Sequence, residues 1–182
     1  MGGRLFALVG PSGAGKDTLL AAASAARPDL VIVQRVITRP ESAGGEPFEG
    51  VTPAEFARRN AAGLFALHWQ AHGLCYGVPA GIHADLDAGH DVIFNGSRGM
   101  LTEACRQFPD LRVILVTAPV PILAARLAAR GRETAQDIAA RLERAGFALP
   151  EGLNISQIDN SGALEDAVAM FLAALQPQPD SA

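Results

Sequence analysis

The sequence has 182 residues, which suits one domain with a full hydrophobic core. Hydrophobic residues make up 49% and charged residues 19%, an ordinary balance for a globular protein. The net charge of −4 argues against nucleic acid as a partner, because nucleic-acid binders carry basic surfaces. No stretch predicts a membrane span or a signal peptide, so we expect a cytoplasmic protein with no membrane partner.

The first predicted elements are a strand, a glycine-rich turn and a helix. Residues 4–9 form a short apolar run of strand length, and Lys16 to Ala26 form an Ala- and Leu-rich helix. A second short strand is predicted over 30–33. From Pro40 to Val51 the composition shifts to Gly, Pro, Glu and Ser, which is typical of a mobile loop.

Further along, Thr52 is predicted to cap a helix that begins at Pro53. Four strands are then expected, at residues 64–69, 75–78, 91–94 and 111–117. An Arg-rich helical stretch follows over 118–145, interrupted near Gly131. The alternation of strands and helices predicts an α/β fold with a mainly parallel central sheet.

The segment from Gly10 to Lys16 reads GPSGAGK and matches the GxxxxGK pattern of a P-loop, between a predicted strand and a predicted helix. Its backbone N–H groups and the helix N-terminus favour phosphate oxygens, and the lysine reaches the β- and γ-phosphates. We therefore predict that the chain binds a nucleoside triphosphate. The predicted nucleotide-binding residues are Gly10, Pro11, Ser12, Gly13, Ala14, Gly15, Lys16, Asp17 and Thr18.

The basic residues are distributed unevenly between the two long cationic side chains. Of the 15 Lys and Arg residues, only Lys16 is a lysine. A lysine kept where every other basic position is Arg indicates that a compact ammonium is needed there.

Asp17 occupies the position where a P-loop usually carries the Ser or Thr that binds Mg²⁺. The carboxylate either binds Mg²⁺, directly or through water, or only complements the positive helix N-terminus. An anion beside a triphosphate is unfavourable unless a cation lies between them. We therefore predict Asp17 as a metal ligand and expect Mg²⁺ dependence.

Several motifs in the same order make the chain similar to guanylate kinases. These are the loop GPSGAGKDTLL, ITRP at 37–40, Gly45-Glu46, AEF at 54–56, Tyr76-Gly77, and the Arg-rich segment from Arg126 to Leu142. The resemblance implies a guanylate-kinase-like P-loop fold over 1–176. It also implies an inserted acceptor-binding subdomain over about 36–80 and an Arg-rich helical lid over about 126–146. Residues 177–182 are expected to be a flexible tail.

Guanine recognition is not retained in this comparison. Where the family reads the base with polar side chains, this sequence has Arg35, Leu67 and Val78, and the later Asp pair becomes Asn95 and Ser97. A pocket that must hydrogen-bond guanine loses discrimination when such partners become apolar. We therefore do not expect GMP as the preferred acceptor.

The segments GKDTLL, RVITRP, LFALHWQAHGLCYGVP, VIFNGSRGML and RGRET together resemble the ribose 1,5-bisphosphate phosphokinases, over about residues 4–175. The resemblance implies transfer of the γ-phosphate of ATP to ribose 1,5-bisphosphate in phosphonate catabolism, giving 5-phosphoribosyl 1-diphosphate. The acceptor phosphate is already ionised, so no general base is expected. The stretch from Pro47 to Gly50 is more apolar than this family leads us to expect.

The resemblance also implies roles for arginines. Arg39 is expected to grip the acceptor phosphate, Arg130 and Arg141 to close over the phosphates during transfer, and Arg132 to contact ATP. The expected substrate-binding residues are Arg35, Arg39, Tyr76, Asn95, Ser97 and Arg98, with Arg35 or Arg98 holding the sugar 5-phosphate. Arg58 and Arg59 are expected on a solvated helix face.

Two other classes remain open at this point. One is a nucleoside monophosphate kinase with altered base preference, and the other is a non-catalytic interaction module with this fold. The intact Gly15 and Lys16 argue against the second class. The sequence leaves the oligomeric state open, including a homodimer.

Overall fold

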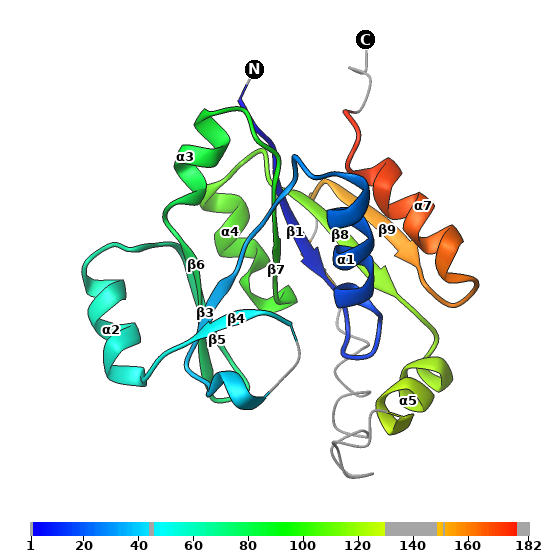
Figure 1. Cartoon of the computed structure of the whole chain (residues 1–182), viewed down its shortest axis with the longest axis horizontal. Helices are drawn as coiled ribbons and strands as arrows, with labels where there is room; N and C mark the ends of the chain where they lie inside the picture. The colour runs from blue at the N-terminus through cyan, green and yellow to red at the C-terminus, as the bar shows by residue number, and fades with distance from the viewer. Residues whose placement is uncertain (1, 44–45, 130–148, 151, 178–182) are drawn as a thin grey trace. The chain divides into compact units, whose positions relative to one another are not determined.

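A computed structural model of the chain describes residues 2–43, 46–129, 149–150 and 152–177 (Figure 1). The strands form a five-stranded sheet of order β2-β7-β1-β8-β9 and a four-stranded sheet of order β4-β3-β6-β5. The α/β class predicted from the sequence is confirmed. The chain divides into two compact units, Met1–Leu8 with Pro28–Arg112 and Val9–Arg27 with Val113–Ala182, which are described separately below.

In the first unit, three parallel strands carry the buried core: β1 (Leu5–Val9), β2 (Val31–Ile32) and β7 (Val92–Asn95). Every residue of β1 and of β7 is buried, as their continuous apolar runs require. An ion pair between Arg4 and Asp91 joins the residues that precede these two strands. Helices α3 (Ile82–Asp87) and α4 (Leu101–Gln107) and the short 3-10 helix η2 (Arg98–Met100) complete this part.

The second sheet lies wholly within the first unit. It contains β3 (Arg35–Ile37), β4 (Phe48–Gly50), β5 (Phe65–Ala71) and β6 (Leu74–Pro79), with β3 and β4 parallel and the other pairs antiparallel. The predicted break between the last two strands is a two-residue hairpin turn. His72 and Gly73 both have positive φ, which matches the twist of the flanking strands.

The segment from Pro40 to Val51 was expected to be a mobile loop, and that expectation is wrong for part of it. Its described residues contain the 3-10 helix η1 (Glu41–Ala43) and β4, which pairs with β3. Phe48 is 5% exposed, so burial of one aromatic ring gives this short segment a place in the sheet. Local composition missed the strand because only three residues of it are paired.

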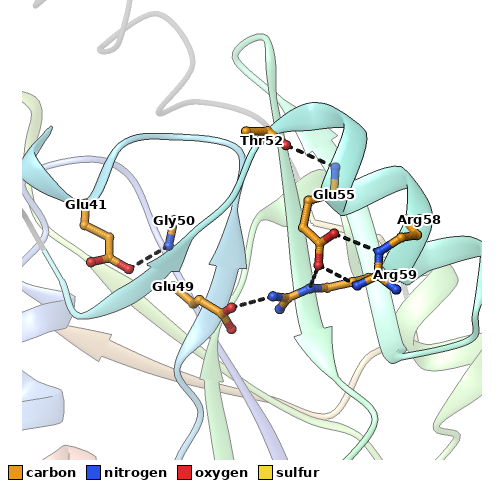
Figure 2. Close-up of polar contacts among 7 residues, drawn as sticks. All are labelled: Glu41, Glu49, Gly50, Thr52, Glu55, Arg58 and Arg59. Carbon is orange, nitrogen blue, oxygen red and sulfur yellow. Dashed lines mark hydrogen bonds and ion pairs between the residues drawn. The ribbon is translucent and has the colours of Figure 1, made fainter.

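Helix α2 (Pro53–Ala61) begins where the sequence predicted, with Thr52 accepting a hydrogen bond from the Glu55 N–H. Figure 2 shows how this helix is joined to the strand before it: Arg59 bonds Glu55 in its own helix and Glu49 on β4. Glu41 accepts from the Gly50 N–H at the end of the same strand. Arg58 is exposed and pairs only with Glu55 among the contacts drawn, as expected for a solvated helix face. The same expectation is wrong for Arg59, which is half-buried because it also reaches Glu49 on β4.

Among its described residues, the second unit contains β8 (Arg112–Thr117), β9 (Ile155–Asp159) and the helices α1 (Lys16–Ala26), α5 (Val120–Ala129) and α7 (Leu164–Ala174). Strands β8 and β9 are parallel. Helices α1 and α7 lie side by side, with Ala23 and Phe171 fully buried (Figure 1). Among the described residues, no helix combines the length and the apolar composition that crossing a membrane requires.

Candidate active site

The P-loop occupies the turn between β1 and α1. Gly15 caps the helix in the left-handed conformation, and Lys16 is the first helical residue. The Lys16 ammonium folds back over the turn and donates to the carbonyl oxygens of Gly10 at 3.0 Å and Pro11 at 3.1 Å. The glycine-rich turn therefore positions the lysine at the helix N-terminus, where phosphate oxygens are favoured.

Two side chains from later in the chain hold the backbone of this loop. The side-chain amide of Asn160, which is 4% exposed, donates to the Ala14 carbonyl at 2.7 Å. Arg126, on α5, donates to the Asn160 carbonyl at 2.8 Å and to the Gly13 carbonyl at 3.5 Å. These contacts hold the carbonyl oxygens of Gly13 and Ala14 and so help to fix the conformation of the loop.

Asp17 and Thr18 lie in the first turn of α1 and are exposed. Within the described ranges, no group of three or more His, Cys, Asp or Glu side chains could hold a metal ion. Mg²⁺ in kinases is held by one or two carboxylates together with substrate phosphates and water, so a single accessible carboxylate beside the P-loop fits that ion. The position of Asp17 is compatible with its predicted role.

Arg39 lies just beyond the end of β3, on a backbone held by the neighbouring strand. Thr38 pairs with Cys75 through both its N–H and its hydroxyl group. The Arg39 guanidinium carbon lies 4.4 Å from the ring centroid of Phe48. This contact gives the unexpected apolar residue between Pro47 and Gly50 a second role beside core packing, because an aromatic face attracts a cation.

The structure brings together three of the predicted substrate-binding residues, Arg35, Tyr76 and Asn95. Arg35 forms an ion pair with Glu46, and the side-chain amide of Asn95 donates to the same carboxylate at 3.0 Å. The Arg35 guanidinium carbon lies 5.1 Å from the Tyr76 ring centroid. Glu46 was not among the predicted site residues, although the Gly45-Glu46 marker had drawn attention to it.

Ser97 and Arg98 follow β7, where Ser97 precedes η2 and Arg98 begins it. Both residues are half-buried. Burial lowers the pKa of the Arg98 guanidinium. Arg35, the other residue predicted to hold the sugar 5-phosphate, already pairs with Glu46.

The positions that lost guanine-reading side chains lie inside the second sheet. Leu67 and Val78 face each other across β5 and β6 and are 2% and 0% exposed. Buried aliphatic side chains have no donors or acceptors to offer a base. The apolar substitutions therefore belong to a packed core.

Three of the predicted site residues, Arg130, Arg132 and Arg141, lie outside the described residues, within 130–148. Most of the expected lid lies there as well. Asn160 has a P-loop contact that the sequence did not reveal. Asn160 and Ala14 are far apart in the chain, so their contact has no signature in the sequence.

Known proteins with similar sequences indicate the same kind of protein as the P-loop does. No family model matches the chain. The chain is 48% identical over 177 residues to the ribose 1,5-bisphosphate phosphokinase PhnN of Ruegeria sp. strain TM1040, covering 97% of this chain and 93% of that protein. It is 49% identical over 181 residues to the protein of the same name from Pseudomonas paraeruginosa strain PA7, covering 96% of each. The chain belongs to the ribose 1,5-bisphosphate phosphokinase family.

Family membership makes this chain a kinase. A bifunctional ribose 1,5-bisphosphokinase-thymidine phosphorylase of Cupriavidus necator is 47% identical over 175 residues, which are 96% of this chain but only 29% of that protein. Solved structures show the fold: a guanylate kinase from Anaplasma phagocytophilum matches with a TM-score of 0.69 at 20% identity, covering 95% of this chain and 85% of that one. The guanylate-kinase-like fold that the motifs implied is confirmed.

Proposed function

We propose that this phosphokinase transfers the γ-phosphate of ATP to the 1-phosphate of ribose 1,5-bisphosphate, giving 5-phosphoribosyl 1-diphosphate and ADP. The observation that carries the proposal is the identity of 48–49% to ribose 1,5-bisphosphate phosphokinases along nearly the full length of both chains. The matched regions cover 96–97% of this chain, so they are not confined to the P-loop. The apolar, buried Leu67 and Val78 support the same choice over a guanine nucleotide.

On the donor side, the P-loop N–H groups and Lys16 bind the β- and γ-phosphates of ATP. Asp17 would hold Mg²⁺, which when bound would supply positive charge that offsets the charge of the transferring group. The loop geometry supports the proposed ATP contacts of Gly10 to Thr18. Arg132 is proposed to contact ATP on the family resemblance alone.

On the acceptor side, the attacking group is a phosphate oxygen that is ionised at neutral pH. No side chain has to remove a proton, and the task of the protein is to bring two anions together. Arg39 is proposed to hold the 1-phosphate and Arg98 the 5-phosphate, with Tyr76 and Ser97 as polar contacts. Guanidinium groups suit this task because they bind phosphate in a bidentate manner.

Three further parts of the proposal depend on the family resemblance. Arg130 and Arg141 are proposed to stabilise the charge of the transferring phosphate. The acceptor side is assigned to residues 36–80, and closure over the phosphates to residues 126–146. We also propose a cytoplasmic enzyme of phosphonate catabolism, whose oligomeric state is left open, including a homodimer.

The test is product analysis with purified protein, ATP, Mg²⁺ and one acceptor at a time. Ribose 1,5-bisphosphate is expected to give 5-phosphoribosyl 1-diphosphate and ADP in equal amounts, and GMP is expected to give little GDP. Efficient GDP formation without 5-phosphoribosyl 1-diphosphate would identify a nucleoside monophosphate kinase instead. Omission of Mg²⁺ is expected to abolish transfer.

A further inference from the structure

A buried arginine lies against two aromatic rings in the second sheet. Arg35, on β3, is 7% exposed. Its guanidinium carbon is 5.1 Å from the Tyr76 ring centroid and 5.7 Å from that of Trp69. The two rings stack with centroids 5.4 Å apart and an interplanar angle of 7°, because Trp69 and Tyr76 are paired across β5 and β6. The cation is therefore fixed in place by the sheet itself.

The carboxylate of Glu46 is held on both of its oxygens. Oε1 pairs with Nη2 of Arg35, and Oε2 accepts from the side-chain amide of Asn95 at 3.0 Å. The Glu46 side chain is only 18% exposed. Each carboxylate oxygen can accept more than one hydrogen bond, so both retain capacity for a further donor. The pair with Arg35 leaves the cluster close to neutral.

The same cluster contains a donor for which the described residues offer no acceptor. The Nε–H of Arg35 is buried, and no described residue accepts a hydrogen bond from it. A buried donor without a partner is costly, so an oxygen that accepts from it would be stabilising. The position therefore offers one donor, Nε–H, and one acceptor, the Glu46 carboxylate, within one side-chain network.

This combination has a chemical preference. A phosphate accepts from Arg35 but has no hydrogen to give Glu46, and the carboxylate repels it. A hydroxyl group both donates and accepts, so it satisfies the two groups at once. Carboxylates bind ribose hydroxyls in the same manner in dinucleotide-binding folds. The preference is for a sugar hydroxyl over a phosphate.

We propose that Glu46, positioned by Arg35 and Asn95, is a specificity-determining residue that binds a ring hydroxyl of the acceptor sugar. This inference rests on the proposed function, because ribose 1,5-bisphosphate has free hydroxyls at carbons 2 and 3. Asn95 ends β7, and ligands of α/β sheets bind at the carboxyl ends of the strands. The proposed phosphate grip, Arg39, follows the same strand that carries Arg35. One substrate molecule can therefore bind Arg39 through a phosphate and Glu46 through a ring hydroxyl.

The experiment compares three acceptors: ribose 1,5-bisphosphate and its 2-deoxy and 3-deoxy analogues. The wild-type enzyme is expected to prefer the parent over one analogue by about 10- to 100-fold in kcat/KM, the range for a hydrogen bond to a charged group. Glu46→Gln is expected to raise KM for the parent and to reduce that preference to less than about threefold. A residue that only stabilised the sheet would affect parent and analogue alike.

Glu49→Gln is the matched control, since Glu49 is an exposed carboxylate on β4 that pairs with Arg59. It is expected to keep the full preference for the parent. An unchanged preference for the parent in Glu46→Gln overturns the inference. A wild-type enzyme that uses both deoxy analogues as well as the parent also overturns it, and this result requires no variant. Failure of the wild-type protein to phosphorylate ribose 1,5-bisphosphate overturns the proposed function itself, which is a separate result.

Discussion

The side-chain amide of Asn160 reaches the P-loop and donates a 2.7 Å hydrogen bond to the Ala14 carbonyl. The same nitrogen lies 2.4 Å from the position that a Cβ on Gly15 would take. Asn160 therefore donates a hydrogen bond to the loop and also packs directly against it. Its own carbonyl accepts from Arg126, so the loop, the end of β9 and helix α5 form one network.

Asn160→Ala removes the hydrogen bond and leaves the Ala14 carbonyl without that partner. Loss of a buried hydrogen bond costs about 1–3 kcal/mol, and we expect kcat/KM for ATP to fall by about 10- to 100-fold. Steady-state kinetics with ATP varied measure this. Gln157→Ala is the control, because Gln157 is exposed on β9, the strand that ends just before Asn160. Equal kinetics for the two variants would show that the loop keeps its shape without Asn160.

Gly15→Ala is expected to be more damaging than the loss of its neighbour's side chain. Gly15 has φ 94°, and an added Cβ would lie 2.4 Å from the Asn160 nitrogen. Two causes of damage, backbone strain from the positive φ and overlap with Asn160, can be separated with Gly63→Ala. Gly63 has φ 69° and nothing within 4 Å of an added Cβ, so only the strain applies there. Backbone strain alone costs about 1–2 kcal/mol, so Gly63→Ala is expected to lower the unfolding midpoint modestly without affecting kinetics. Gly15→Ala is expected to abolish ATP binding as well, measured by calorimetry, and normal binding would contradict the steric argument.

Much of the fold could be predicted from the sequence because long apolar strands and their helices are local features. Helix α1 spans Lys16–Ala26 as predicted, and the hairpin at His72-Gly73 follows from turn residues between two strand patterns. Strand β4 was missed because three residues carry little pattern, and its pairing with β3 depends on a contact between segments. Such pairing is not visible in local composition.

The site was predictable to the extent that its chemistry lies in contiguous motifs. Lys16 and Arg39 could be named from short segments with known phosphate-binding roles. Glu46 and Asn160 could not be assigned a role, because each acts on a residue distant in the chain: Glu46 on Asn95, and Asn160 on Ala14. The ion pair between Arg35 and Glu46 was also not visible in the sequence. Because Glu46 balances the charge of Arg35, the pair suits a hydroxyl better than a phosphate.

The charges on α2 predict a specific dependence of stability on pH. Hydrogen bonds from Arg58 and Arg59 lower the pKa of Glu55 from 4.5 to about 2. A carboxyl with a lowered pKa in the folded state stabilises the protein above its unfolded pKa, and this contribution is lost as the pH falls from 4.5 through about 2. We expect Glu55→Gln to flatten the decline of the thermal unfolding midpoint in this window.

Arg59→Ala and Arg58→Ala provide the matched comparison for this network. Arg59 bonds two carboxylates and its side chain is 24% exposed, whereas Arg58 bonds one and is 68% exposed. Exposed pairs contribute little, so the first variant is expected to lower the unfolding midpoint more than the second. The reverse order would show that the link from α2 to β4 does not stabilise the unit.

The single lysine of the chain predicts an unusual intolerance of arginine. The Lys16 ammonium fits over the turn with donors to Gly10 and Pro11, and a guanidinium is larger and planar. Lys16→Arg keeps the charge but is expected to lower kcat by at least about 100-fold, close to the loss in Lys16→Ala. Single-turnover transfer from ATP measures this. Near-normal transfer by Lys16→Ala would refute the proposed stabilisation of the γ-phosphate.

Trp69 gives the proposed acceptor site an intrinsic optical signal, because it is the only tryptophan in the chain. Its ring stacks on Tyr76 and lies 5.7 Å from the Arg35 guanidinium carbon. A hydroxyl that binds to Glu46 and Arg35 changes the electrostatic surroundings of the indole. We therefore expect ribose 1,5-bisphosphate to change the emission of the protein in a saturable manner.

The midpoint of that titration is expected to move to higher concentration in Glu46→Gln and to stay unchanged in Glu49→Gln. Trp69→Phe removes the signal and serves as the blank, since phenylalanine retains a stacking ring beside Tyr76. A flat titration in a preparation that turns over ribose 1,5-bisphosphate would place the sugar away from Trp69. In that case the buried Arg35–Glu46 pair would be a structural element of the second sheet, and sugar recognition would have to come from other residues.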